Sequence, residues 1–324
     1  MKTCFIGGTG RCGTSILRTI LSRHSRVATL PIEHRLTVDP DGIFDFYRSY
    51  TSGWSPYYAD ARLTRLKNFL EELSSTNPVH KIFRYLFRAF RLAGLSITPK
   101  KYLDVELSHF IPNYSEHVNT LLNELVEFEY TGERLGTRSY SFNNKIQYAP
   151  NYSKEQLKKI FQNFIHSFIQ DILTHNHKDC FIEDNTWNIL FSADLLDLIP
   201  NAKIISVIRD PRDVVASLSK QKWMPSNKAQ SAKIYNDLIV EWIEIRRNLD
   251  KQSWIEVRLE DVVLEPESQI RKICDFIELP WEDNLLKIDL SKSNSGQWKK
   301  DFSEEEKRSV IPLLAEHIKS FGYE

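Results

Sequence analysis

Short apolar runs bounded by polar residues recur along the chain and indicate β-strands. Five such runs stand out: Cys4–Ile6, Val27–Leu30, Cys180–Ile182, Ile204–Ile208 and Trp254–Val257. The segments between them carry apolar residues at helical spacing. Strands that alternate with helices are typical of a parallel sheet covered by helices on both faces. The pattern predicts an α/β fold with a central, mostly parallel β-sheet flanked by helices.

Two helix starts are well defined, because a capping box opens each of them. Ser153 with Gln156 opens one helix, and Ser303 with Glu306 opens the C-terminal helix, which we expect to end near Gly322. One apolar stripe follows the first box, and its regular spacing predicts a core-facing side: Leu157, Ile160, Phe161, Phe164, Ile165, Phe168 and Ile172.

Residues 39–150 differ in composition from the rest of the chain. They are rich in aromatic residues, proline and basic residues, and they carry few strand signals. We expect a mostly helical, aromatic-rich insertion within a single domain that spans residues 1–324. Most rings of a helical segment belong to its core, so any one ring is expected to be structural.

Composition limits the possible functions. The chain has 324 residues, 41% of them hydrophobic and 27% charged, with a formal net charge of zero. This balance excludes a disordered chain and disfavours bulk binding of nucleic acid. The four cysteines are isolated from one another, which argues against a zinc site or a disulfide framework. No apolar run approaches the about 20 residues of a membrane span, and we expect a cytoplasmic protein.

The stretch GGTGRCGTS, residues 7–15, follows the first apolar run and precedes a helical pattern. Gly8 and Gly13 satisfy the spacing of a nucleotide-binding loop, but Thr14 stands where lysine is usual, and Arg11 is the cation inside the loop. A glycine-rich turn that opens a helix presents backbone N–H groups to an anion. The same turn without a ligand is the plainer alternative.

A second candidate anion site follows the strand at residues 204–208. Arg209 leaves the carboxyl end of this strand, and Asp210-Pro211 predicts an N-cap and a first helical residue. Ligands of α/β folds gather at the carboxyl ends of strands. Considered alone, the stretch is equally compatible with a helix cap and surface ion pairs.

Together the two stretches resemble the sulfotransferases that use 3′-phosphoadenosine 5′-phosphosulfate (PAPS). The loop pattern of that family, G-x-x-[RK]-S-G-T-[ST], is met from Gly8 to Ser15, with Cys12 in place of serine. The 3′-phosphate pattern, R-[DN]-P-x-[DE]-x-x-x-S, is met from Arg209 to Ser217. Residues 254–281 are similar to the family's Y-E-D segment, with Leu259 in place of tyrosine, and residues 295–307 are similar to its G-x-W-K segment.

The resemblance implies PAPS as the donor, 3′-phosphoadenosine 5′-phosphate (PAP) as the product, and no metal. By this resemblance Arg11 stabilises the leaving oxygen during in-line transfer, and Arg209 with Ser217 holds the 3′-phosphate. Lys292 is retained from the family's basic triplet, which here reads Ser-Lys-Ser. The expected donor-binding residues are Gly10, Arg11, Cys12, Gly13, Thr14, Ser15, Arg209, Ser217, Lys292, Gly296, Gln297 and Trp298.

Glu33 is the expected general base. It lies in LPIEHRL, residues 30–36, which resembles the Glu-x-Arg segment of tyrosylprotein and several bacterial sulfotransferases. A structural ion pair of Glu33 with Arg35 or Arg11 is the alternative. His34 is the second candidate base and His109 the third.

The expected acceptor bears a hydroxyl group: a carbohydrate, a phenol, a peptide tyrosine or a small metabolite. Under this reading the insertion forms the acceptor-binding subdomain. A small-molecule kinase that uses ATP and magnesium is one rival function, and a non-catalytic nucleotide-binding protein is another. The sequence carries no signal for an oligomeric state.

Overall fold

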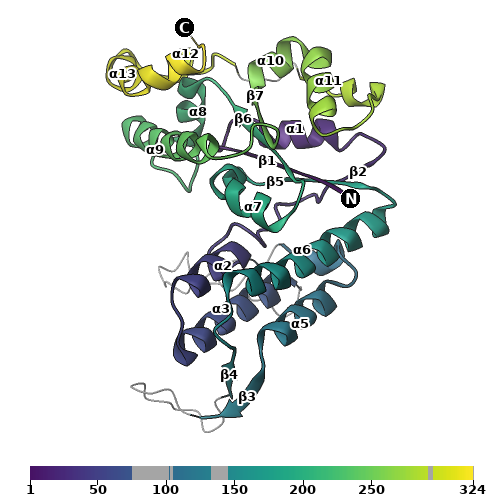
Figure 1. Ribbon diagram of the computed structural model, residues 1–324. Helices are drawn as coiled ribbons and strands as arrows, with labels where there is room; N and C mark the ends of the chain where they lie inside the picture. The colour runs from purple at the N-terminus through teal and green to yellow at the C-terminus, as the bar shows by residue number, and fades with distance from the viewer. Residues whose placement is uncertain (75–101, 103–104, 133–144, 291–294, 324) are drawn as a thin grey trace, which may run out of the picture. The chain divides into compact units, whose positions relative to one another are not determined.

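The computed structural model contains two compact units. One comprises Met1–Thr29 with Lys178–Glu324, and the other comprises Leu30–His177. The structure describes residues 1–74, 102, 105–132, 145–290 and 295–323 (Figure 1). The predicted insertion, residues 39–150, falls within the second unit; its role as an acceptor-binding subdomain stays a prediction.

The first unit is built on a five-stranded parallel sheet with the strand order β2-β5-β1-β6-β7. Its strands are β1 (Lys2–Gly8), β2 (Val27–Ala28), β5 (Cys180–Asp184), β6 (Lys203–Ile208) and β7 (Trp254–Arg258). Every predicted strand is present, so the predicted fold class is confirmed. Strand β2 is shorter than the predicted Val27–Leu30, because this edge strand pairs with β5 at two positions only.

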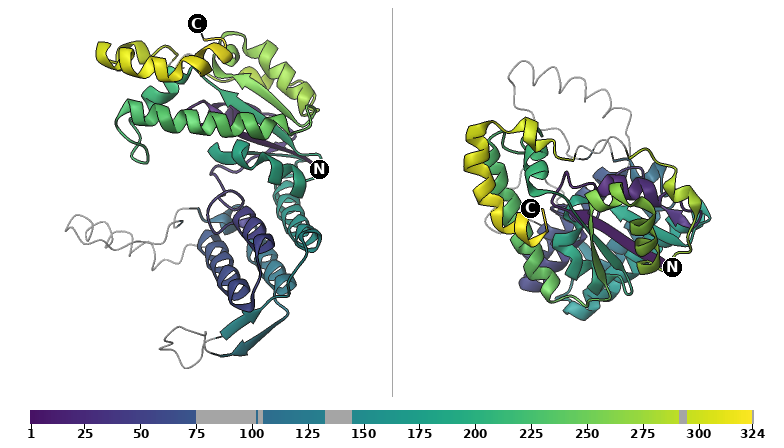
Figure 2. Two further views of the ribbon diagram at one scale, coloured as in Figure 1. Left: turned by 60° about the vertical axis from the view of Figure 1, so that its left-hand side comes forward. Right: turned by 90° about the horizontal axis from the view of Figure 1, so that it is seen from above.

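Helices cover both faces of this sheet, as parallel strands require. Figures 1 and 2 show α8, α9 and α13 on one face, and α1, α10 and α11 on the other. The elements of the unit outside the sheet are α1 (Thr14–Leu21), η2 (Thr186–Phe191), α7 (Ser192–Leu198), α8 (Pro211–Leu218), α9 (Lys228–Arg247), α10 (Leu259–Leu264), α11 (Pro266–Phe276), η3 (Asp283–Leu286), α12 (Trp298–Asp301) and α13 (Glu304–Ser320). The capping box of Ser303 and Glu306 is present at α13, and Gly322 follows this helix with a φ of 71°.

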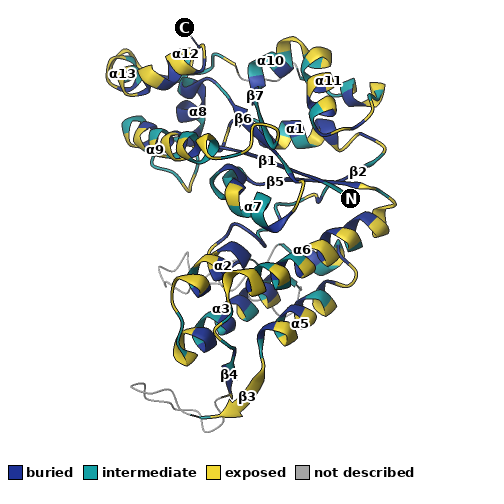
Figure 3. Cartoon of the chain, in the orientation of Figure 1, coloured by how far each residue is buried: buried dark blue, intermediate teal, exposed yellow. Residues whose placement is uncertain are grey.

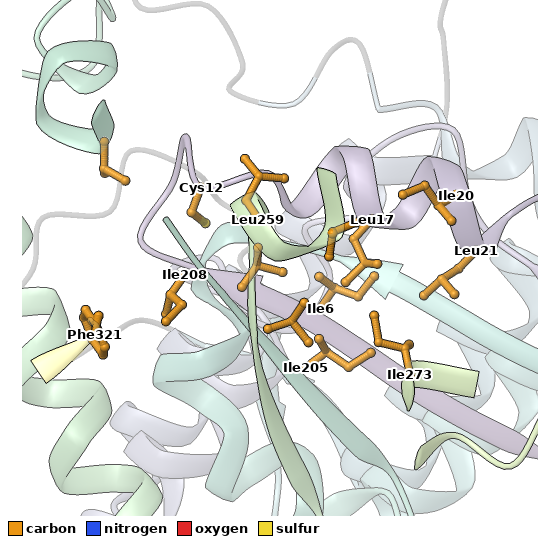
Figure 4. Packing of buried hydrophobic residues seen from close by; sticks show 14 of the residues in the cluster. Ile6, Cys12, Leu17, Ile20, Leu21, Ile205, Ile208, Leu259, Ile273 and Phe321 are labelled. Atoms are coloured by element: carbon orange, nitrogen blue, oxygen red, sulfur yellow. The ribbon is translucent and has the colours of Figure 1, made fainter. Parts of the chain in front are cut away.

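The core of the first unit joins the sheet to α1 and α11. Ile6 and Ile205 are neighbours in the parallel register of β1 and β6, and both are fully buried. Figure 4 shows them beside Leu17 of α1 and Ile273 of α11. Complete burial of an aliphatic side chain contributes about 1.5–3 kcal/mol to folding. These contacts fix the end of β1, and with it the loop that follows.

The second unit packs four described helices and a hairpin. Its elements are α2 (Ile43–Ser52), α3 (Pro56–Ser74), η1 (Leu107–His109), α5 (Tyr114–Leu125), β3 (Phe128–Thr131), β4 (Lys145–Tyr148) and α6 (Lys154–Asn176). The capping box of Ser153 and Gln156 is present at α6. Its predicted stripe is buried except for Ile160, which is half-buried.

The antiparallel pair β3–β4 was not predicted within the helical insertion. All four residues of β3 are exposed (Figure 3), so no buried face marks it as a strand. Its pairing is supported by Phe128, whose ring stacks on Tyr148 at 4.6 Å between centroids. Other rings of the insertion belong to the core, as expected: Tyr47, Tyr50 and Tyr114 are buried.

In the described part of the chain, no helix combines the length and apolarity needed to cross a membrane.

Candidate active site

The loop between β1 and α1 has an unusual backbone. Gly10, Arg11 and Gly13 have φ angles of 80°, 58° and 107°, all in the left-handed region. Gly13 is the N-cap residue of α1 and makes no side-chain cap hydrogen bond. A turn of this kind can present the first N–H groups of a helix to an anion, which stays a prediction for this loop.

Two glycines of the loop are required by close contacts. A Cβ atom on Gly8 would lie 2.2 Å from Sγ of Cys12, and one on Gly13 would lie 2.7 Å from Cδ1 of Leu259. The side chain of Cys12 is therefore folded under the loop, where it is fully buried, and burial raises the pKa of its thiol. Its contact with a donor stays a prediction, and such a contact would come from its backbone, because its side chain is buried.

Leu259 covers Gly13 from the position at which the family pattern has tyrosine. Its side chain also belongs to the hydrophobic core of the first unit (Figure 4). This packing gives the departure from the pattern a structural role.

The two predicted anion stretches meet in the structure. Nη1 of Arg209 donates to the carbonyl oxygen of Arg11 at 3.1 Å, and Nε of Arg11 donates to Oγ of Ser217 at 3.0 Å. Asp210 caps α8 by accepting the N–H of Arg212, and Pro211 is the first residue of the helix, both as predicted. The loop after β1, Arg209 before α8 and Ser217 near the end of α8 thus form one surface that carries two arginines.

Asp213 joins this surface to residues 296–298. Its carboxylate, which is fully buried, accepts the N–H groups of Gly296 at 2.6 Å and of Trp298 at 2.8 Å. Nη2 of Arg209 lies 3.7 Å from the same carboxylate. Burial raises the pKa of Asp213, whereas the two N–H donors and Arg209 lower it. The sequence showed Asp213 as a pattern match, but it did not show this role.

The G-x-W segment is held on its other side by a stacking contact. The guanidinium of Arg212 lies 4.4 Å from the centroid of the Trp298 ring, and Asp210 holds that guanidinium at 2.8 Å. Gly296 adopts a φ of 72°. Gln297 lies between the two held residues and is half-buried. Lys292 lies outside the described residues.

A pocket of about 140 Å³ adjoins Arg209. Its wall is formed by Leu259, Val263 and Leu264 of α10, and its polar groups come from Arg209, Glu260 and Ser295. An apolar wall with a few convergent polar groups is typical of small-molecule sites.

Asp184 lies at the carboxyl end of β5, the strand next to β1. Nε of Arg18 lies 2.6 Å from its carboxylate, and the hydroxyl of Ser15 also hydrogen-bonds to it. Burial raises the pKa of Asp184, and the charge of Arg18 lowers it. The described residues contain no group of three or more His, Cys, Asp or Glu side chains arranged to hold a metal ion.

The candidate bases all belong to the second unit. Glu33 is partly exposed and forms an ion pair with Arg35 at 2.6 Å, so the structural alternative for this pair is present. His34 is 2% exposed, its Nδ1 accepts the N–H of Leu36, and burial lowers its pKa to about 3. A buried, neutral ring is a poor candidate for the base. His109 is exposed and contacts Glu106.

A parallel α/β sheet with a glycine-rich loop after its central strand defines a P-loop-like α/β protein. The sequence model of the Sulfotransferase family matches residues 103–283, which is more than half of the chain. The protein belongs to this family. The matched range includes Arg209 and Ser217 and begins after the first loop.

Similar sequences include two animal enzymes. Protein-tyrosine sulfotransferase A of Caenorhabditis elegans is 28% identical over 136 residues, which are 40% of this chain and 36% of that protein. A protein-tyrosine sulfotransferase of Drosophila melanogaster is 33% identical over 97 residues, which are 28% of this chain and 19% of that protein. The matches thus span about a third or less of these relatives.

Similar solved structures include the sulfotransferase domain of the Synechococcus PCC 7002 olefin synthase. It has a TM-score of 0.46 and 15% identity, and covers 96% of this chain and 86% of that one. Sulfotransferase STF9 of Mycobacterium avium has a TM-score of 0.45 and 11% identity, and the match covers 99% of this chain and 76% of that one.

Proposed function

We propose that this sulfotransferase takes its sulfuryl group from PAPS and transfers it to a hydroxyl-bearing acceptor. The observation that carries the proposal is the junction of Arg11, Arg209 and Ser217. It places cations from two distant segments on one surface, as a donor with phosphates at both ends of a nucleoside requires.

The residues of the first unit fit such a donor. When bound, PAPS would supply an activated sulfuryl group on its 5′-phosphate. The left-handed turn from Gly10 to Gly13 suits that end, because successive N–H groups of such a turn can bind an anion. Arg209 and Ser217 suit the 3′-phosphate, and the apolar wall at Leu259 suits the base.

The chemistry of the loop is electrostatic. Arg11 and the N–H groups at the start of α1 would stabilise negative charge on the leaving oxygen, which accounts for most of the rate in transfers of this type. Thr14 is largely buried, whereas Ser15 is exposed at the first turn of the helix. The hydroxyl of Ser15 bonds to Asp184, which orients it at the loop.

Glu33 is our proposed base. Its side chain is 30% exposed, whereas His34 is buried. Arg35 would orient the carboxylate through their ion pair. The relatives named protein-tyrosine sulfotransferases favour a phenolic hydroxyl as the acceptor. A cytoplasmic location stays a prediction.

Calorimetric titration with PAP and with ATP plus magnesium tests the donor. We expect PAP to bind more tightly, and equal or tighter binding of ATP would refute the proposal. Arg209→Ala should weaken PAP binding at least tenfold, as expected for loss of about 1.4 kcal/mol or more from a charged contact. Arg271→Ala, which removes an exposed arginine paired with Glu267, is the matched control.

Turnover tests the base. Glu33→Gln should leave PAP affinity unchanged and abolish sulfuryl transfer to a panel of phenols, tyrosyl peptides and sugars. Glu116→Gln changes another carboxylate of the second unit and should retain full rate. Full activity in Glu33→Gln would assign the base to another residue.

The rival kinase function is disfavoured by Arg18. In metal-dependent phosphoryl transfer, a loop hydroxyl and an aspartate at a neighbouring strand end hold magnesium. Here the guanidinium of Arg18 lies against the corresponding carboxylate, that of Asp184. A non-catalytic protein would bind PAP and transfer nothing to any acceptor of the panel.

A further inference from the structure

Trp223 lies beside the loop after β1, at Gly10, and Trp187 packs against Trp223. A Cβ atom on Gly10 would lie 3.3 Å from Cη2 of Trp223 and 3.4 Å from Cγ2 of Thr186. Trp187 follows Thr186 and meets Trp223 edge to face, with 6.5 Å between ring centroids and 84° between planes. The two rings form an aromatic corner, defined here as Trp187 and Trp223.

Trp223 is 54% exposed. Tryptophan is highly buried on average, because its ring carries one of the largest apolar surfaces of any side chain. An exposed tryptophan next to an anion-binding loop leaves a flat apolar surface for a ligand. Tryptophans in such positions often contribute much of the energy of binding.

The two ends of the loop have different neighbours. Gly13 is covered by Leu259, which also lines the pocket at Arg209. Gly10 contacts the aromatic corner instead. In-line transfer places the acceptor and the leaving group on opposite sides of the transferred group. With the nucleotide at the Leu259 end, the acceptor enters at the Gly10 end.

We propose that Trp187 and Trp223 bind an aryl ring that carries the acceptor hydroxyl; this inference rests on the proposed sulfuryl transfer. Two perpendicular rings offer a third ring one face and one edge, which are the contacts that aromatic pairs prefer. The next nearest atoms at Gly10 are a methyl of Thr186 and a methyl of Leu218. A pyranose would need hydrogen-bond partners for several hydroxyls, so the corner favours a phenol over a sugar.

Binding of 2-naphthol in the presence of PAP, measured by calorimetry, tests the corner without turnover. Trp223→Ala should weaken 2-naphthol binding about tenfold, the loss expected for one stacked ring, and leave PAP affinity within twofold. Trp223→Phe should retain most of the affinity. The control Trp281→Ala removes a half-buried tryptophan that stacks on Arg271 at 3.9 Å, and should change neither affinity. Unchanged 2-naphthol affinity in Trp223→Ala would overturn the proposal.

Kinetics separate aryl from sugar acceptors. Trp223→Ala should raise KM for 2-naphthol about tenfold, with kcat within twofold. An equal rise for methyl glucoside as acceptor would overturn the aryl assignment. If the unaltered protein binds 2-naphthol through Trp223 but does not bind PAP, the proposed function fails and the aryl site stands. If the unaltered protein binds PAP and sulfates alcohols, but Trp223→Ala changes neither the affinity nor the KM for 2-naphthol, the aryl site fails and the function stands.

Discussion

Asp213 should be required both for stability and for donor binding, although we expect no contact between its side chain and the donor. Its buried carboxylate accepts two backbone N–H groups, from Gly296 and Trp298. Hydrogen bonds to a charged group contribute about 1.5–3 kcal/mol each. In Asp213→Asn the amide keeps one acceptor oxygen and turns an NH₂ group toward the other donor. One bond is lost and a buried N–H is left without a partner, so we expect the free energy of unfolding to fall by about 2–3 kcal/mol.

Urea unfolding and calorimetric titration with PAP measure the two effects. Because Asp213 holds residues 296–298 against α8, PAP affinity should also fall at least tenfold, the equivalent of about 1.4 kcal/mol. Asp179→Asn is the matched control: it changes an exposed carboxylate that pairs with the exposed Arg26, and should cost under about 1 kcal/mol. A free energy of unfolding within about 0.5 kcal/mol of that of the unaltered chain, which is about the precision of such measurements, together with PAP affinity within twofold, would refute the reasoning. The contact of Arg212 with Trp298 would then suffice to hold the segment.

Three further predictions concern stability. Burial lowers the pKa of His34 to about 3, so below pH 6.5 the unfolded chain takes up a proton that the folded chain does not. The free energy of unfolding should therefore fall by about 2 kcal/mol between pH 7 and pH 5, and His34→Gln should flatten this part of the urea-unfolding profile; an equal slope in the variant would contradict the assignment. Gly8→Ala places a methyl 2.2 Å from Sγ of Cys12 and should lower the free energy of unfolding by about 3 kcal/mol. The double variant with Cys12→Ala should recover part of this loss. Thermal unfolding of Gly8→Ala that matches the parent would count against this packing. Arg18→Met leaves the buried Asp184 without its cation and should cost about 3 kcal/mol by urea unfolding, whereas adding Asp184→Asn should restore part of the loss; no recovery would show that the charge is not responsible.

The sheet could be predicted from the sequence because parallel strands are buried on both faces and form continuous apolar runs. Cys180–Asp184 and Lys203–Ile208 show this clearly, since all or nearly all of their residues are buried. The β3–β4 hairpin could not be predicted, because its exposed strand depends on a cross-strand partner that spacing alone does not reveal.

Part of the candidate site could be predicted from the sequence for a related reason. The loop and the helix cap at Asp210 are local, and local patterns are visible in a sequence. The bonds of Asp213 to Gly296 and Trp298 join positions 83 and 85 residues apart, so nothing in the local pattern predicts them. The burial of Cys12 depends likewise on the space that Gly8 leaves beneath the loop.

The stretch from Arg209 to Asp213 combines two tasks, and this determines which substitutions can test the function. Asp210 caps α8 and holds Arg212, Arg212 stacks on Trp298, and Asp213 binds the segment that contains Trp298. Changes at any of these three residues alter the folded state together with any bound donor, because they remove contacts within the protein. Arg209 lies at the edge of this network: its Nη1 donates to the carbonyl oxygen of Arg11, and its Nη2 lies 3.7 Å from the carboxylate of Asp213. A loss of PAP affinity in Arg209→Ala with little loss of stability would therefore report on the donor, whereas the same loss in Asp213→Asn reports on the segment that covers it.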